Sequence, residues 1–171
     1  MTEQQPTSTA RQERPRIVIE RTYPGRVEEM WALWTTKDGF ESWWGPVGFR
    51  ADVHAVEARQ GGLLHYDMVA DTPEMVEAMK EMGRPSSHPT RATFSEYRPY
   101  ERLAMTSVID FFPGVATYDS TIEVDFFPKG DAVRMVVTLG PMHDAEITGM
   151  QAEGFTSQLS KLDARFGVTA T

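Results

Sequence analysis

The sequence contains no cysteine and no long apolar run. Without cysteine the chain cannot form a disulfide, a thiolate metal site or a cysteine nucleophile. A membrane-spanning helix needs roughly 18 or more consecutive apolar residues, and no such stretch occurs. The first fifteen residues also lack the apolar segment of a secretory signal. These absences lead us to expect a cytoplasmic protein.

Positive charge is in short supply as well. The 171 residues include 17 Lys and Arg against 25 Asp and Glu, which gives a formal net charge of −8. A net acidic surface repels nucleic-acid phosphates and anionic lipids. The densest basic stretch, between Arg11 and Arg21, is diluted by Glu13 and Glu20. We therefore expect neither nucleic acid nor a membrane surface as a partner.

Familiar catalytic motifs are missing too. The sequence has no G-x-S-x-G, no phosphate-binding loop, no H-E-x-x-H and no G-x-G-x-x-G. Its four histidines, His54, His65, His88 and His143, do not have metal-ligand spacing. We expect no metal and no cofactor. His143 next to Asp144 could suggest a general base with its orienting carboxylate, but a helix cap explains the pair better.

Aromatic residues and methionine are plentiful, with 11% aromatics, four Trp and ten Met. Trp31 and Trp34 share a helical face with Val27, which predicts that both belong to a core. Neighbours on a helix differ in direction by about 100°, so Trp43 and Trp44 cannot both be buried on one face. We expect one of that pair to face the mouth of a cavity.

Hydrophobic periodicity divides the chain into a polar tail and one domain. Residues 1–15 are predicted to be disordered, and residues 16–168 to form a single domain. Strands are predicted at 16–22, 49–57, 64–69, 92–97, 102–110, 118–127 and 132–139, with two short helices between 27 and 43. Residues 71–90 form a helical and loop insert with Met75, Met79 and Met82 on one helix face.

The last predicted element is a helix over 145–166, with Asp144 as its N-cap. At about 33 Å it is the element long enough to cover an antiparallel sheet. Because glycine weakens a helix, Gly154 suggests a close approach to that sheet. The predicted class is α+β, with about six to seven antiparallel strands and two short helices after the first strand.

Several segments together resemble a known family. They are Val27-Glu28-Glu29-Met30-Trp31, Trp43-Trp44-Gly45-Pro46, Arg59-Gln60-Gly61-Gly62, Phe94-Ser95-Glu96-Tyr97-Arg98-Pro99 and Gln151-Ala152-Glu153-Gly154-Phe155. In this order, over residues 16–166, the sequence resembles the START-like (SRPBCC) superfamily, in the group related to the C-terminal domain of the activator of Hsp90 ATPase. The resemblance implies a helix-grip fold, in which a curved antiparallel sheet wraps around the C-terminal helix and leaves an elongated cavity. Members bind apolar or amphipathic small molecules, and some are cyclases, dehydratases or hydrolases.

This cavity is the best site hypothesis, because ligand sites are mostly apolar with a few convergent polar groups. We expect its lining to include Trp44, Leu64, Tyr66, Met68, Phe94, Glu96, Asp110, Tyr118, Met150 and Phe155. A lid could come from Met75, Met79 and Met82, although those residues could equally be plain packing at the sheet edge.

Glu96, Tyr66 and His143 are the catalytic candidates. If Glu96 shares an inward face with Phe94, it is a buried carboxylate with a raised pKa, suited to act as a general base or ligand anchor. If it points outward, it is a solvated sheet residue. A buried Tyr66 hydroxyl needs a partner, which could be a ligand, a side chain or water. His143, Tyr118 and Asp110 could rim the cavity mouth.

Three functions are compatible with the sequence, and we give them in decreasing order of preference. The first is a carrier or sensor of a small apolar or amphipathic molecule, and the second is an enzyme in which at least two acid/base groups converge inside the cavity. The third, by analogy with the family name, is a co-chaperone-like protein-binding module. It ranks last because the length leaves no room for a further domain. Paired tryptophans and a methionine face also make a homodimer an option.

Overall fold

The computed structural model describes residues 16–110 and 112–168. The tail predicted over residues 1–15 lies outside these residues. The elements, in chain order, are β1 (Ile17–Pro24), α2 (Val27–Thr35), α3 (Lys37–Glu41), β2 (Phe49–Val56), β3 (Leu63–Ala70), α4 (Pro73–Glu81), β4 (Ser87–Arg98), β5 (Arg102–Ile109), β6 (Tyr118–Lys129), β7 (Ala132–Leu139) and α5 (Ala145–Phe166).

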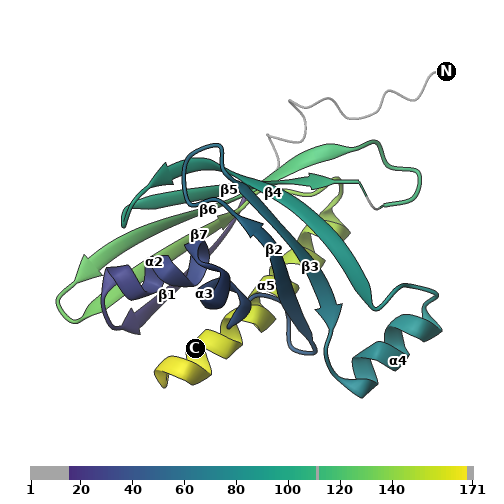
Figure 1. Ribbon diagram of the computed structural model, residues 1–171, viewed down its shortest axis with the longest axis horizontal. Coiled ribbons are helices and arrows are strands. Elements are labelled where there is room, and N and C mark those ends of the chain that lie inside the picture. Colours follow the sequence, from purple (N-terminus) through teal and green to yellow (C-terminus); the bar gives the residue numbers. More distant parts are fainter. Residues whose placement is uncertain (1–15, 111, 169–171) are drawn as a thin grey trace.

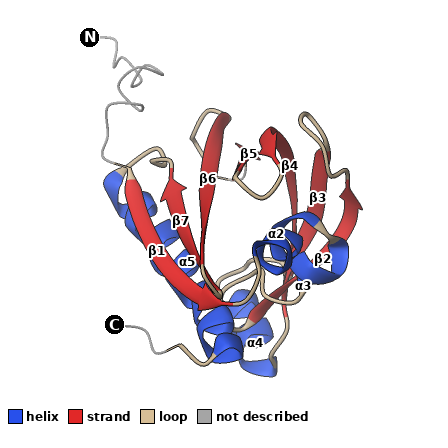
Figure 2. Cartoon of the chain, turned by 90° about the vertical axis from the view of Figure 1, so that its left-hand side faces the viewer, coloured by secondary structure: helices blue, strands red, loops and turns tan. Residues whose placement is uncertain are grey.

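The seven strands of the described residues form one antiparallel sheet in the order β1-β7-β6-β5-β4-β3-β2. The sheet curls into a half-barrel, and α5 runs along its concave side (Figures 1 and 2). The predicted α+β class and helix-grip arrangement are confirmed. No described helix is long and apolar enough to cross a membrane.

The start of β4 differs from the prediction. Proline at 85 and 89 suggested a loop as far as residue 90, whereas β4 begins at Ser87 and pairs with β3 through Met68 and His88. Pairing of β4 with β5 begins only at Ala92. Pro89 therefore lies where β4 has a neighbour on one side alone, and a missing N–H is tolerated at such an edge. The insert is correspondingly shorter than 71–90.

Helix α5 begins and ends as predicted. The Asp144 carboxylate accepts a hydrogen bond from the Ile147 amide at 2.8 Å, and Gly167 ends the helix in the left-handed conformation at φ 68°. The expected close approach of Gly154 to the sheet is wrong. A Cβ built at Gly154 would meet only the side chain of Pro46, at 3.7 Å. Room remains on this face of α5.

A cluster of aromatic rings fills the concave side between the first helices and α5. Trp34 contacts Trp43 and Trp44 with ring centroids 5.0 and 5.6 Å apart, and Phe155 of α5 packs against all three. Trp43 and Trp44 are both buried, so neither is exposed at a cavity mouth as expected, although Trp44 lines the cavity described below. They lie in the turn after α3 with rings 80° apart, so each reaches a different part of the core.

Gly149 offers a stability prediction, because it is an exposed residue within α5. Nothing lies within 4 Å of a Cβ built there. Gly149→Ala should raise the free energy of unfolding by about 1 kcal/mol, the difference in helix propensity. Chemical denaturation measures this value, and a variant less stable than the wild type would contradict the assigned surroundings of Gly149.

Candidate functional site

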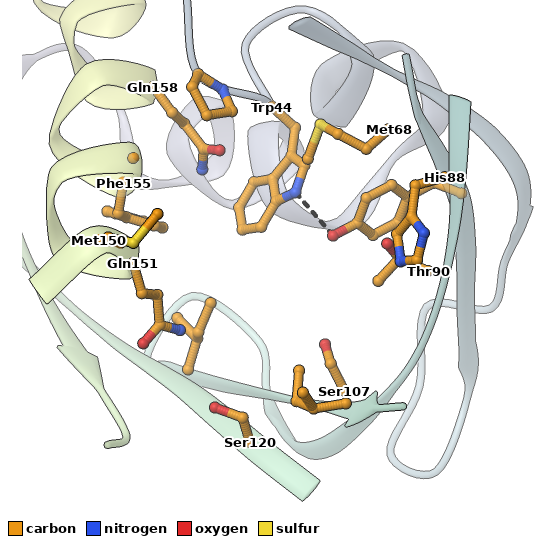
Figure 3. A pocket seen from close by; sticks show the side chains of 15 residues that line it. Trp44, Met68, His88, Thr90, Ser107, Ser120, Met150, Gln151, Phe155 and Gln158 are labelled. Carbon is orange, nitrogen blue, oxygen red and sulfur yellow. Dashed lines mark hydrogen bonds between the residues drawn. The ribbon is translucent and has the colours of Figure 1, made fainter. Parts of the chain in front are cut away.

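A cavity of about 390 Å³ lies between the N-terminal half of α5 and the middle of the sheet. Its walls come from α5, from β3 to β6 and from the turn after α3, as the close-up in Figure 3 shows. The lining residues are Trp44, Pro46, Tyr66, Met68, His88, Thr90, Ser107, Ile109, Ser120, Ile122, Met150, Gln151, Gly154, Phe155 and Gln158. Both its size and its apolar walls are typical of small-molecule sites.

One side of the cavity is built by Trp44 and Tyr66. The Trp44 indole N–H donates a hydrogen bond to the Tyr66 hydroxyl oxygen at 3.0 Å, drawn as the dashed line in Figure 3. Burial raises the pKa of the Tyr66 hydroxyl, while hydrogen bonds with Trp44 and Thr90 act against this rise. Tyr66 thus has protein partners for its hydroxyl group and is uncharged at neutral pH.

Three polar atoms of lining residues lack a hydrogen-bond partner within the described part of the chain. They are the Ser120 hydroxyl oxygen, Gln151 Oε1 and Gln158 Nε2. Ser120 and Gln158 are only 7% and 4% exposed. A buried polar atom without a partner costs about 1–3 kcal/mol, so groups of this kind are rare and require an explanation. Here three of them surround one cavity.

The backbone fixes which end of the Gln158 amide is unpaired. The Gly45 N–H donates to Gln158 Oε1 at 2.8 Å, so the amide oxygen is already used. The Nε2 group is then the unpaired end. It offers N–H donors and has no acceptor capacity. Gln158 therefore presents donors for a group that accepts hydrogen bonds.

None of the lining residues is Asp, Glu, Lys or Arg. Apart from His88, no lining side chain can carry a charge to pair with a charged ligand group, and burial of an unpaired charge is strongly unfavourable. The cavity therefore suits an uncharged group that can accept a hydrogen bond.

The predicted lining residues fall into two sets. Trp44, Tyr66, Met68, Met150 and Phe155 line the cavity. Leu64 and Phe94 do not line it, and both are fully buried in the main core. Met150 is 59% exposed although it lines the cavity, which places it where the cavity meets solvent.

Glu96 lies on the outer face of the sheet, not in the cavity. The strand register shifts between Phe94 and Glu96, so the two do not share a face as the regular alternation predicted. Glu96 accepts hydrogen bonds from Arg98 and Arg102, each at 2.9 Å. The Arg102 hydrogen bond lowers the pKa of Glu96, opposite to the rise expected of an inward carboxylate. Of the two expectations for Glu96, a buried inward carboxylate or a solvated outward residue, the second is correct.

The remaining polar candidates also lie outside the lining. His143 Nδ1 and the Tyr118 hydroxyl are 2.8 Å apart, and Tyr118 belongs to a small second cluster with Ile109 and Met142. Asp110 is exposed and forms an ion pair with Arg91 at 3.0 Å. Within the described ranges, no three His, Asp or Glu side chains are grouped as metal ligands would be.

The methionines of the expected lid lie along α4, which extends beyond the ends of β3 and β4 (Figure 1). Met75 lies against Gly48, and Met82 is 60% exposed. Met79 borders a second cavity beside the first one, as described below. None of the three lines the main cavity.

Sequence reasoning missed the polar lining residues, although a signal for them was present. Gln151 and Gln158 flank Phe155 at helical spacing, on the stripe that faces the sheet. Ser107 and Ser120 occupy inward positions of β5 and β6, where apolar residues alternate with polar ones. A polar side chain at an inward position is the feature that could have identified them.

Comparisons with known proteins agree with this architecture. A crystal structure of a Chromobacterium violaceum protein superimposes with a TM-score of 0.71 at 19% identity, covering 88% of this chain and 96% of that one. A crystal structure of an activator-homologue protein from Silicibacter pomeroyi gives 0.69 at 19% identity, over 90% and 98% of the two chains. A solution structure from Arthrobacter aurescens gives 0.70 at 18% identity, over 91% and 88%.

At these identities the solved structures establish the fold alone. Among curated proteins, none matches the sequence significantly. A family model does match, over residues 25–167, and it is described as "Activator of Hsp90 ATPase homolog 1-like protein". Its match spans the described helices, strands β2 to β7 and the cavity-lining face of α5, so the chain belongs to the family of activator of Hsp90 ATPase homolog 1-like proteins.

Proposed function

We propose that the protein binds a mostly apolar small molecule in the cavity between α5 and the sheet, and that the part of the molecule inside this cavity is uncharged. The observation that carries the proposal is the set of unpaired polar atoms on Ser120, Gln151 and Gln158, which surround a cavity without charged residues. A ligand with a carbonyl or similar acceptor would satisfy Gln158 Nε2, and its apolar part would lie against Trp44 and Phe155.

Water alone is the competing explanation for these atoms. Ordered water occupies cavities that offer it two to four polar partners, and it commonly satisfies buried groups. A ligand that places its acceptor at Gln158 would displace such water and bury its own apolar surface at about 25 cal/mol per Å². Saturable binding of an apolar probe therefore separates a ligand site from a hydrated void.

The enzyme alternative has less support. It requires two of Glu96, Tyr66 and His143 inside the cavity, and Tyr66 is the one of the three that lines it. Burial raises the pKa of Tyr66, so its uncharged hydroxyl is a poor proton acceptor. The co-chaperone-like module and the homodimer stay predictions.

Acetophenone is a suitable probe, since it combines a flat apolar ring with one carbonyl acceptor. Ethylbenzene has nearly the same shape and no acceptor. We expect both to stabilise the protein saturably in thermal unfolding, by about 2.7 kcal/mol at one hundred times the dissociation constant. No saturable stabilisation by acetophenone at millimolar concentrations would contradict the proposal.

Gln158→Met tests the polar contact. The variant should bind acetophenone about fivefold more weakly, because the net value of one hydrogen bond is about 1 kcal/mol. Ethylbenzene should bind as tightly as before, which separates a lost contact from a damaged cavity. Gln60→Met, in the exposed turn before β3, is the matched control and should change neither affinity. Calorimetric titration measures the affinity of both probes for the wild type and for each variant, and equal losses for both probes in Gln158→Met would count against the contact.

A further inference from the structure

A second cavity of about 360 Å³ adjoins the first on the side of α4. We call it the second compartment; it is lined by Phe49, Met68, Met79, Arg84, Pro85, Ser86, His88 and Pro113. Its walls come from the ends of β2, β3 and β4, from α4 with the segment after it, and from the loop between β5 and β6. Most of these side chains are apolar, as in the main cavity.

The two cavities share Met68 and His88 in their linings. A residue that lines both spaces is part of the partition between them. Methionine has three rotatable bonds and adapts its shape more readily than other apolar residues. Met68 is therefore the adaptable part of the wall that the two cavities share.

The second compartment differs from the main cavity in charge. Arg84 contributes a guanidinium group to its lining, whereas the main cavity is lined by no Asp, Glu, Lys or Arg. Arg84 is exposed and has no ion-pair partner among the described residues. On a chain with a net charge of −8, an unpaired arginine beside an apolar cavity favours a negatively charged group.

We propose that the ligand is elongated and amphipathic, extends past Met68 into the second compartment, and ends in an anionic group beside Arg84. This inference rests on the proposed function, because the uncharged part of the ligand occupies the main cavity. A carboxylate at the far end would stay near solvent next to Arg84. The desolvation that excludes a charge from the main cavity would therefore not apply to it.

Three methyl ketones test the inference with the full chain. Octan-2-one is short enough to occupy the main cavity alone, and dodecan-2-one is longer by four carbons. The third probe, 11-oxododecanoate, also has twelve carbons and carries a carboxylate at the end opposite its ketone. Met79→Trp should obstruct the second compartment. Val76→Trp places the same ring on α4 at a residue that is 41% exposed and does not line the compartment, so it is the matched control.

We expect Met79→Trp to weaken both twelve-carbon probes at least tenfold, since each methylene kept out of an apolar site costs about fourfold in affinity. Octan-2-one should bind equally to both tryptophan variants and to the wild type. Arg84→Gln should weaken 11-oxododecanoate about two- to fivefold, as an exposed charge pair does, and leave dodecan-2-one unchanged. Calorimetric titration gives these affinities, with circular dichroism to verify that α4 is intact.

The outcomes separate the two proposals. Suppose that octan-2-one binds, but that Met79→Trp does not change the affinity of either twelve-carbon probe. This result would contradict the role of the second compartment and leave the proposed function of the main cavity intact. If Arg84→Gln changed the affinities of dodecan-2-one and 11-oxododecanoate by the same factor, the proposed contact between Arg84 and an anionic group would be wrong. A failure of octan-2-one to bind would contradict the proposed function itself. If the tryptophan disturbs α4, Met79→Phe replaces it with a smaller ring.

Discussion

Gly154→Leu is expected to abolish binding of acetophenone, with a loss of at least about a hundredfold in affinity, or about 2.7 kcal/mol. Gly154 lines the main cavity, and its missing side chain leaves space in front of Pro46. A leucine there would occupy the volume that we assign to the ligand. Titration calorimetry with acetophenone measures the loss directly.

The stability of the same variant makes the result specific. Removal of a glycine from a helix interior favours folding by about 1 kcal/mol, and a leucine that fills an empty apolar cavity adds buried surface. Gly154→Leu should therefore unfold at the wild-type temperature or above while it fails to bind. Gly154→Ala is the control, because its Cβ fits at 3.7 Å from Pro46 and should change affinity only a few-fold. Wild-type affinity in the leucine variant would place the ligand elsewhere.

Asp163→Ala should lower the free energy of unfolding by about 3 kcal/mol, the lower end of the range for breaking a buried charged contact. Asp163 is 4% exposed and lies on α5, where its carboxylate accepts a 2.6 Å hydrogen bond from the Tyr23 hydroxyl. Arg21 approaches the same carboxylate at 3.3 Å. Alanine would leave the fully buried Tyr23 hydroxyl without its acceptor and Arg21 without its partner.

Tyr23 is a donor to Asp163 throughout the neutral range. Burial raises the pKa of Tyr23 strongly, and the hydrogen bond to Asp163 raises it further. Asp163→Asn keeps an amide oxygen that can accept from Tyr23, so it should lose less stability than alanine. Glu20→Ala breaks the exposed pair with Arg134 and should change stability by less than about 1 kcal/mol. Urea denaturation compares the variants, and similar losses for Glu20→Ala and Asp163→Ala would refute the assigned role of the buried contact.

The elements could be predicted because each has a local cause. Asp144 and Gly167 define the ends of α5 through capping and a left-handed residue, and the apolar stripe between them has a helical period. The hairpin of β2 and β3 follows from alternation on either side of a glycine turn. Where a tertiary neighbour decided the outcome, the prediction was wrong. The start of β4 depends on its pairing with β3, which the prolines obscured.

The site was harder to predict because small irregularities decide which way a side chain points. A single extra residue between Phe94 and Glu96 turns the carboxylate from the inner face to the outer one. Alternation cannot reveal such a bulge in one sequence. Two of the candidates that do line the cavity, Tyr66 and Met68, are on a stretch of β3 with regular alternation.

The polar lining depends on contacts between segments distant in the chain. Gln158 became informative only when the Gly45 amide, more than a hundred residues earlier, was seen to use its oxygen. The sequence could indicate that Gln151 and Gln158 share a helix face, but not which atoms were left unpaired. The unpaired atoms, more than the aromatic residues, distinguish a ligand site from a well-filled core.

The most direct test of the proposed function observes the Gln158 side chain during binding. Its Nε2 protons appear in ¹H–¹⁵N correlation spectra and are assigned by their absence in Gln158→Met. On saturation with acetophenone we predict that these resonances shift downfield and exchange more slowly with water, whereas ethylbenzene leaves them without the hydrogen-bond shift. Saturable binding of acetophenone with unchanged Gln158 amide resonances would contradict the account.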